Sequence, residues 1–144
     1  MADRKHSTLV RQMVQSDTQI IQALSEEADM GELSTYENTT VAVDIDTNKI
    51  LGFARIVSYD NIYYLSPLVV DRTARGMGIG SLLIQSVVRS FGQLLLVARG
   101  SACDFYYENG GQDVSWDIIA PEVKLECLEC KKREDCNPQP MLLL

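Results

Sequence analysis

The chain has 144 residues, of which 46% are hydrophobic and 23% charged, a balance typical of one globular domain. Its formal net charge is −7, and the sequence shows no basic face of the kind that nucleic-acid-binding proteins use. No apolar run approaches the ~20 residues of a membrane span, and the first residues lack the apolar stretch of a secretory signal. We therefore expect a single cytoplasmic domain over residues 1–144 that binds neither nucleic acid nor a membrane. Its acidity either steers a cationic partner toward it or only keeps it soluble.

The first half of the chain predicts a strand, a helix and three further strands. Residues 8–14 are expected to form the first strand, and a helix with apolar residues at helical spacing follows Asp17. Three segments rich in β-forming residues come next, at residues 40–45, 50–57 and 62–70, separated by short polar turns. The last of these is apolar on both faces at its end, as expected of a buried central strand.

The second half predicts a helix, a strand, a short helix and a last strand. Residues 81–91 carry apolar side chains at the spacing of an amphipathic helix, which ends at Gly92. A buried strand at 94–98, a short helix at about 101–109 and a strand at 114–119 follow. This order of elements predicts a mixed α/β fold with a partly antiparallel sheet.

The glycine-rich loop between the third strand and the amphipathic helix is the most informative segment. Gly76, Gly78 and Gly80 carry no side chain, so backbone N–H groups there can approach a ligand closely. The N-terminus of the following helix adds free N–H groups and a dipole that favours an anion. Arg75 can add charge-assisted contacts to phosphate oxygens. The loop therefore predicts a cradle for a pyrophosphate group.

Other phosphate-binding loops fit this segment less well. A P-loop requires a lysine that is missing here. The dinucleotide-binding fingerprint requires a third glycine where Ser81 stands, and an acidic residue about twenty positions further on, near Arg99. A kinase glycine loop joins two strands rather than a strand and a helix. The remaining alternative is a glycine-rich turn without a ligand.

Two segments resemble the GNAT N-acetyltransferases. Residues 75–80, Arg-Gly-Met-Gly-Ile-Gly, resemble the Arg-x-x-Gly-x-Gly loop with which that family binds acetyl-CoA. Residues 102–110 resemble its Ala-x-x-Phe-Tyr-x-x-x-Gly helix, and the order of elements is similar over about residues 8–120. The resemblance implies the acyl-CoA N-acyltransferase fold, which has a mixed, mostly antiparallel central sheet flanked by helices.

The resemblance also implies a reaction, in which the acetyl group of acetyl-CoA moves directly to a primary amine of a small molecule or peptide. The end of the third strand would bind the pantetheine arm, and the loop would hold the pyrophosphate. The implied cofactor-binding residues are Leu68, Val69, Val70, Arg75, Gly76, Met77, Gly78, Ile79, Gly80 and Ser81. A homodimer is a further expectation, because dimers are common in families like this one.

Tyr106 matches the tyrosine that, in the family, gives a proton to the departing CoA thiolate. Packing in the core is the other role open to it, and a one-residue offset of the helix would exchange it with Tyr107. The family often carries a glutamate, acting as general base, on the strand before the loop, where this chain has Tyr64 and Ser66. A water chain, Asp60, Glu108 or an acceptor of low pKa could replace it. A CoA-binding sensor or interaction module without catalysis is the alternative.

Three of the four cysteines, Cys127, Cys130 and Cys136, lie within ten residues of one another in a cysteine-rich tail at about 121–144. The Cys-x-x-Cys spacing fits two ligands of a structural zinc ion, with Cys136 as the third. Cys103, His6 or a water would complete the site. A redox pair between Cys127 and Cys130, or unreactive thiols, are the alternatives. If this tail held a working metal or redox site, the chain would be a metal- or redox-responsive regulatory protein.

Overall fold

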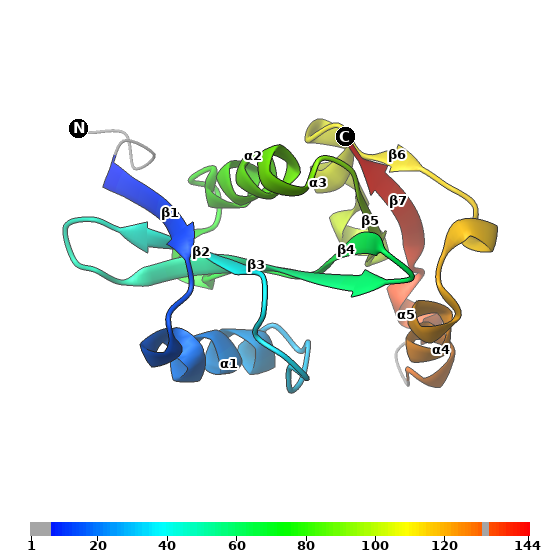
Figure 1. The fold of residues 1–144 in the computed structure, drawn as a ribbon, viewed down its shortest axis with the longest axis horizontal. Helices are drawn as coiled ribbons and strands as arrows, with labels where there is room; N and C mark the ends of the chain where they lie inside the picture. Colours follow the sequence, from blue (N-terminus) through cyan, green and yellow to red (C-terminus); the bar gives the residue numbers. More distant parts are fainter. Residues whose placement is uncertain (1–6, 131–132) are drawn as a thin grey trace.

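The computed structural model describes residues 7–130 and 133–144, which form a seven-stranded sheet with helices on both faces (Figure 1). The strands are β1 (Thr8–Gln12), β2 (Thr39–Asp44), β3 (Ile50–Tyr59), β4 (Ile62–Val70), β5 (Leu94–Ala98), β6 (Gln112–Asp113) and β7 (Gln139–Leu143). The helices are α1 (Thr18–Glu27), α2 (Ile79–Phe91), α3 (Cys103–Glu108), α4 (Pro121–Glu129) and α5 (Arg133–Cys136). The strand order in the sheet is β1-β2-β3-β4-β5-β7-β6.

All neighbouring strands in this order are antiparallel except β4 and β5, which are parallel. The register of β4 and β5 contains one residue pair among the described residues, Tyr64 with Leu95. Beyond that pair, the described residues of β4 do not pair with β5. The backbone N–H and C=O groups on this side of β4, toward its carboxyl end, are therefore free of the neighbouring strand. The predicted mixed, mostly antiparallel sheet flanked by helices is confirmed.

Helices cover both faces of this sheet. In Figure 1, α2 lies above the sheet, and α1 and α4 lie below it. Leu83 and Val87 of α2 are buried in the larger core on one face. Ile21 of α1 packs with Phe53 and Val69 on the other face. None of the described helices is long and apolar enough to cross a bilayer.

The strands predicted at 40–45, 50–57, 62–70 and 94–98 are confirmed as β2, β3, β4 and β5. Hydrophobic patterning located them because β2, β3 and β5 are buried along most of their length, and β4 is buried at Tyr64, Leu65 and Val69. The glycine-rich loop lies, as predicted, between β4 and α2.

The strand predicted at 114–119 is wrong. The strand in this region is Gln112–Asp113, and Trp116–Ile118 forms a short 3₁₀ helix instead. Ser115 caps that helix, because its side-chain oxygen accepts a hydrogen bond from the backbone N–H of Asp117 at 3.1 Å. A local side-chain contact therefore overrides the β-forming composition of this stretch.

Residues 121–144, expected as a cysteine-rich tail, contain α4, α5 and β7. β7 pairs with β5 on one side and with β6 on the other. Met141 and Leu143 of β7 are fully buried in the same core as α2. This segment therefore supplies an interior strand of the sheet.

Candidate active site

A cavity of about 590 Å³ opens between the carboxyl ends of β4 and β5. Its walls come from the end of β4, the glycine-rich loop, the start of α2, the segment after β5 and α3. The lining residues that the sequence predicted as cofactor-binding are Leu68, Val69, Val70, Arg75, Gly76, Gly78, Ile79, Gly80 and Ser81. Met77 is the predicted residue that is not in this lining, because its side chain packs against the hydrophobic core.

The three glycines of the loop have two different structural roles. Gly76 and Gly78 have φ angles of 81° and 79°, in the left-handed region where a side chain costs roughly 1–2 kcal/mol. Gly78 is the N-cap of α2 and provides no side-chain cap, so the first N–H groups of that helix face the loop uncapped. At Gly80 a Cβ atom would lie 2.8 Å from the Phe105 ring. Glycine at that position lets α2 pack closely against α3.

The two arginines of the loop differ in what they contact. Arg72 forms an ion pair of 3.0 Å with Glu27 of α1, which ties the loop to that helix. Arg75 is exposed and lines the cavity, and its Nε atom makes only a long contact of 3.4 Å to the Val70 carbonyl. Its guanidinium is therefore the one positioned to contact an anion in the cradle.

Tyr106 and Tyr107 of α3 point to different surroundings. Tyr106 lines the cavity and is 8% exposed, and burial raises its pKa to about 12. Within the described residues, its hydroxyl has no hydrogen-bond partner. The Tyr107 hydroxyl donates a 2.6 Å hydrogen bond to Asp113 of β6, outside the cavity, and that bond raises its pKa to about 12. Of the two tyrosines, Tyr106 is the one that can reach a group in the cavity.

Neither position that the family often gives to a general base has a carboxylate here. Tyr64 is 2% exposed, and its hydroxyl accepts a hydrogen bond from the Ala120 N–H at 2.9 Å. Ser66 belongs to a β-bulge, because Ala54 of β3 pairs with Leu68 while Ile56 pairs with Leu65, so β4 has one extra residue. Asp60 and Glu108, the carboxylates suggested by the sequence, are absent from the lining of the cavity. No aspartate or glutamate is among the described residues that line it.

The sequence analysis missed two arginines, one in the cavity wall and one buried behind it. Arg99, at the end of β5, lines the cavity and donates from Nη2 to the Asp29 carbonyl at 2.9 Å. It thereby links β5 to the segment after α1 across the cavity mouth. Arg55 of β3 is buried behind the bulge, and its Nε atom donates to the Ser66 carbonyl at 2.6 Å. A charged residue inside an otherwise apolar strand was the available signal for Arg55.

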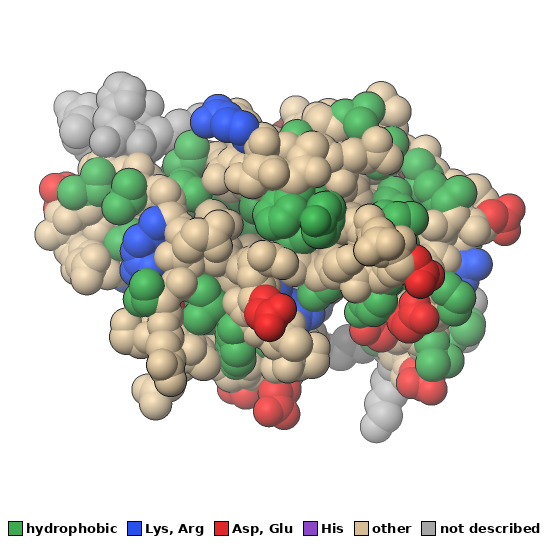
Figure 2. Space-filling model, viewed as in Figure 1, with side chains coloured by type: hydrophobic (Ala, Val, Ile, Leu, Met, Phe, Trp, Pro, Cys, Tyr) green, Lys and Arg blue, Asp and Glu red, His purple; other side chains and the backbone are tan. Residues whose placement is uncertain are grey.

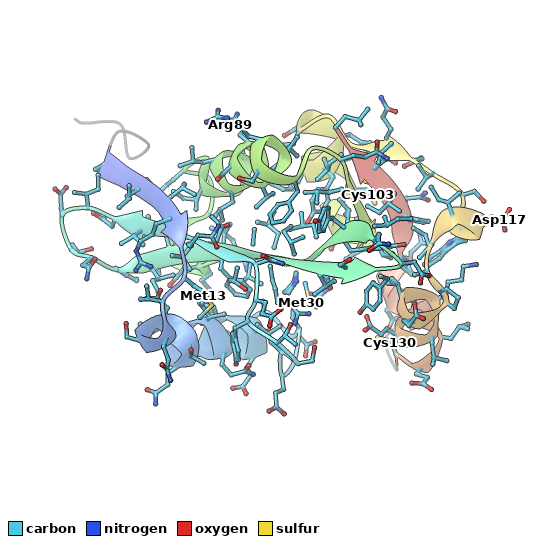
Figure 3. The ribbon with its side chains drawn as sticks, viewed as in Figure 1. Met13, Met30, Arg89, Cys103, Asp117 and Cys130 are labelled. Carbon is cyan, nitrogen blue, oxygen red and sulfur yellow. The ribbon has the colours of Figure 1, made fainter. Side chains whose placement is uncertain are left out.

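The described residues do not bring together the ligands of the predicted zinc site. Among residues 7–130 and 133–144, no group of three or more histidine, cysteine, aspartate or glutamate side chains could hold a metal ion. Figure 3 shows Cys103 on the α3 side of the sheet and Cys130 beside α4 on the opposite side. No disulfide joins Cys103, Cys127, Cys130 or Cys136. His6, the other suggested ligand, lies outside the described residues.

The sequence model of the acetyltransferase (GNAT) family matches residues 10–110, which include the cavity walls from β4 to α3. The chain belongs to the GNAT family. No match was found among curated protein sequences.

Several solved structures have the same fold as this GNAT chain, at low sequence identity. The N-acetylglutamate synthase of Neisseria gonorrhoeae, complexed with coenzyme A and N-acetyl-glutamate, has a TM-score of 0.73 and 18% identity. The match covers 94% of this chain but 34% of the synthase, so the chain spans about a third of that protein. Rv2747 of Mycobacterium tuberculosis, in complex with CoA and NLQ, has a TM-score of 0.74 and 16% identity over 94% of this chain and 98% of that one.

A third similar structure is Arabidopsis thaliana Naa50 in complex with the bisubstrate analogue CoA-Ac-MVNAL. Its TM-score is 0.67 at 16% identity, over 94% of this chain and 97% of Naa50. At these identities the likeness establishes the fold.

Proposed function

We propose that this GNAT protein transfers the acetyl group of acetyl-CoA to a primary amine by direct attack in a ternary complex. The observation that carries the proposal is the single cavity that unites the glycine cradle, the open edge of β4 and the Tyr106 hydroxyl. Family membership and neighbours that hold CoA or a CoA-peptide conjugate support acetyl-CoA as the donor.

The donor would lie along the cavity with its pyrophosphate on the loop. The backbone N–H groups at Gly76 to Ser81, the helix dipole of α2 and the Arg75 guanidinium favour an anion there. The pantetheine arm would pair with the free backbone edge of Leu68–Val70, since β5 does not pair with that part of β4. These contacts hold the thioester beside the β4 bulge.

In the transfer step, the lone pair of a neutral amine forms a bond to the thioester carbonyl carbon, and the carbon–sulfur bond breaks. The backbone N–H of Leu68 would stabilise the charge that develops on the carbonyl oxygen. The departing thiolate takes the Tyr106 proton, and the attacking amine loses its proton to water. Burial raises the pKa of Tyr106, and the same apolar surroundings disfavour a charged thiolate. The hydroxyl therefore donates its proton to the sulfur as negative charge develops there.

Calorimetric binding of acetyl-CoA to three proteins tests the cradle. In Gly78→Glu, a side chain and a negative charge occupy the pyrophosphate position, so binding should disappear. Gly92→Glu is the matched control, because Gly92 caps the other end of α2 with a similar φ of 82° and does not line the cavity. Equal binding by both variants would contradict the proposed cradle.

Release of the CoA thiol in the presence of a panel of primary amines tests the transfer itself. Turnover that requires an amine supports an acetyltransferase. Tight acetyl-CoA binding without turnover on any amine would identify a CoA-binding module instead.

A further inference from the structure

The lower face of the sheet has two separate hydrophobic clusters with a charged residue between them. Phe53 of β3 packs beneath α1, and Val57 of the same strand packs with the residues at the start of α4. Side chains two residues apart on a strand point to the same face. Arg55 therefore projects from the same face of the sheet, between the cluster under α1 and the cluster at the start of α4.

Arg55 is 8% exposed, yet none of the ion pairs among the described residues includes it. Nε donates to the Ser66 carbonyl, and Nη1 donates to the Thr35 carbonyl at 3.0 Å and makes a long contact of 3.4 Å to Ser34 Oγ. All of these acceptors are neutral, and no carboxylate of the described residues lies within 4 Å of the guanidinium. Nη2 has no partner within the described part of the chain.

An arginine stays charged in proteins, so burial without a counter-charge is costly. Desolvation is the main influence on Arg55 and lowers its pKa. Tyr59, Glu126 of α4 and Tyr36 raise it again through Coulomb attraction, without a hydrogen bond or ion pair to the guanidinium. A small anion bound at Nη2 would remove this cost. One guanidinium balances one negative charge, which fits a carboxylate better than a phosphate dianion.

Arg55 also lies close to the place where the acetyl group would be delivered. Its partner Ser66 is part of the β4 bulge, two residues before Leu68 in the cavity wall. Its other partner, Thr35, belongs to the same connection as Met30, which lines the cavity. An acceptor between α1 and α4 would therefore have one end at Arg55 and the other at the thioester.

The far wall of this space is acidic. Figure 2 shows acidic side chains gathered over α4, whose exposed glutamates are Glu122, Glu126 and Glu129. A buried cation beside an acidic wall suits a ligand that carries both charges. The acidic wall attracts the acceptor as an ammonium ion, and Arg55 holds its carboxylate while the deprotonated amine lies at the thioester.

We propose that Arg55 forms a carboxylate-binding subsite, so that the acceptor is an amino acid or a similar small amine that carries a carboxylate. This inference rests on the proposed acetyl transfer, in which the amine attacks at the β4 bulge. Arg55 is a binding residue in this scheme and takes no part in proton transfer.

Ligand-observed NMR on the CoA-saturated protein tests the subsite without requiring turnover. The probes are a mixture of N-acetyl-L-amino acids and the matching N-acetyl-L-amino acid amides, which resemble products with and without the carboxylate. We expect saturation transfer to one or more of the acids and none to the amides. Equal signals from acids and amides, or no signal from any acid, would overturn the subsite.

Variants then assign the effect to one side chain. Arg55→Gln should abolish the signals of the acids, and Arg55→Lys should retain weakened ones, because lysine keeps the charge but loses the planar fork. Arg89→Gln is the matched control, since Arg89 is exposed on α2, pointing away from the sheet in Figure 3, and should leave the signals unchanged. Acid signals that persist in a folded Arg55→Gln protein would overturn the assignment.

A kinetic comparison separates this inference from the proposed function. With L-amino acids and their carboxamides as acceptors, kcat/KM should favour the acids by about 30-fold or more, as expected for a buried charge pair. Equal turnover of acids and amides would refute the subsite and leave acetyl transfer standing. Binding of the acetylated acids without turnover on any amine would retain the subsite and refute the transfer.

Discussion

The Tyr64 hydroxyl accepts a hydrogen bond from the backbone N–H of Ala120, 2.9 Å away, inside the protein. Tyr64 stands where GNAT relatives often place a catalytic glutamate, and here that position anchors the start of α4. The contact holds one wall of the space that we assign to the acceptor. Position 64 thus makes a structural contact, and in the proposed reaction the amine loses its proton by another route.

Tyr64→Phe should therefore affect stability more than catalysis. The substitution leaves the buried Ala120 N–H without an acceptor, which should lower the free energy of unfolding by about 1–3 kcal/mol. Urea unfolding followed by circular dichroism measures this. Tyr63→Phe is the control, because Tyr63 is 39% exposed and packs edge-on against Phe91. A much lower kcat in a folded Tyr64→Phe protein would instead place Tyr64 in the chemistry.

Tyr106→Phe should lower kcat by about 10²–10⁴-fold, the usual contribution of a positioned proton donor. Acetyl-CoA binding should change little, since the hydroxyl acts on the departing thiolate. Steady-state kinetics and calorimetry on the same preparations separate the two effects. Tyr107→Phe, which loses only an exterior hydrogen bond to Asp113, should behave like the wild type. A large loss of kcat in Tyr107→Phe, with none in Tyr106→Phe, would make Tyr107 the proton donor.

The pH profile of kcat should show no alkaline loss of activity from Tyr106 up to pH 11. Its pKa of about 12 keeps the hydroxyl protonated over that range. Activity should rise with pH as more of the acceptor amine becomes neutral. An alkaline fall centred between pH 8 and 10, abolished by Tyr106→Phe, would contradict the raised pKa. The limit of pH 11 follows from the raised pKa of Tyr106, and the interval from pH 8 to 10 follows from an ordinary tyrosine pKa of about 10.

Gly80→Ala should destabilise the protein by about 1–3 kcal/mol through overpacking, because its Cβ would lie 2.8 Å from the Phe105 ring. Phe105→Leu in the same chain should recover part of that loss by removing the ring. A double-mutant cycle of unfolding free energies measures the coupling. Additive effects of the two substitutions would show that the helices adjust without strain.

Asp17→Asn should cost about 2 kcal/mol of stability near neutral pH, since Arg11 donates to the Asp17 carboxylate at 2.8 Å and 3.2 Å. The hydrogen bond from Arg11 lowers the pKa of Asp17 in the folded protein. This stabilisation is therefore present above the unfolded-state pKa of about 3.9 and is lost as the pH falls through the folded value.

Thermal unfolding of the wild type and Asp17→Asn between pH 3 and 7 tests this, with exposed Asp46→Asn as the control. A difference in unfolding temperature that stays constant down to pH 3 would contradict the lowered pKa. The range spans the ordinary aspartate pKa of about 3.9.

Local patterns predicted the parts of this protein that local forces determine. Alternation and apolar runs located the central strands, and the glycine spacing located the loop between β4 and α2. The sequence assigned Gly80 to ligand binding alone. Its contact with Phe105 joins two helices, and the residues of neither helix predict that contact.

The remaining features depend on contacts between distant parts of the chain. The hydrogen bond from Arg55 to the Ser66 carbonyl depends on the bulge at Ser66, which only the pairing of β3 with β4 creates. The spacing of Cys127 and Cys130 suggested a zinc site, but spacing does not determine whether a third ligand folds close to them. The partners of β7 could not be predicted from its own residues, since they lie far away in the sequence.

The interior position of β7 has a consequence for the order of folding. Until β7 is in place, β5 exposes the unpaired edge of an apolar strand beside the cleft. Such an edge is a template for association between chains. β5 and β7 are separated by α3, β6, α4 and α5, so this pairing closes a long loop and should form late. Newly made chains would then depend on the pairing of β7 to escape aggregation.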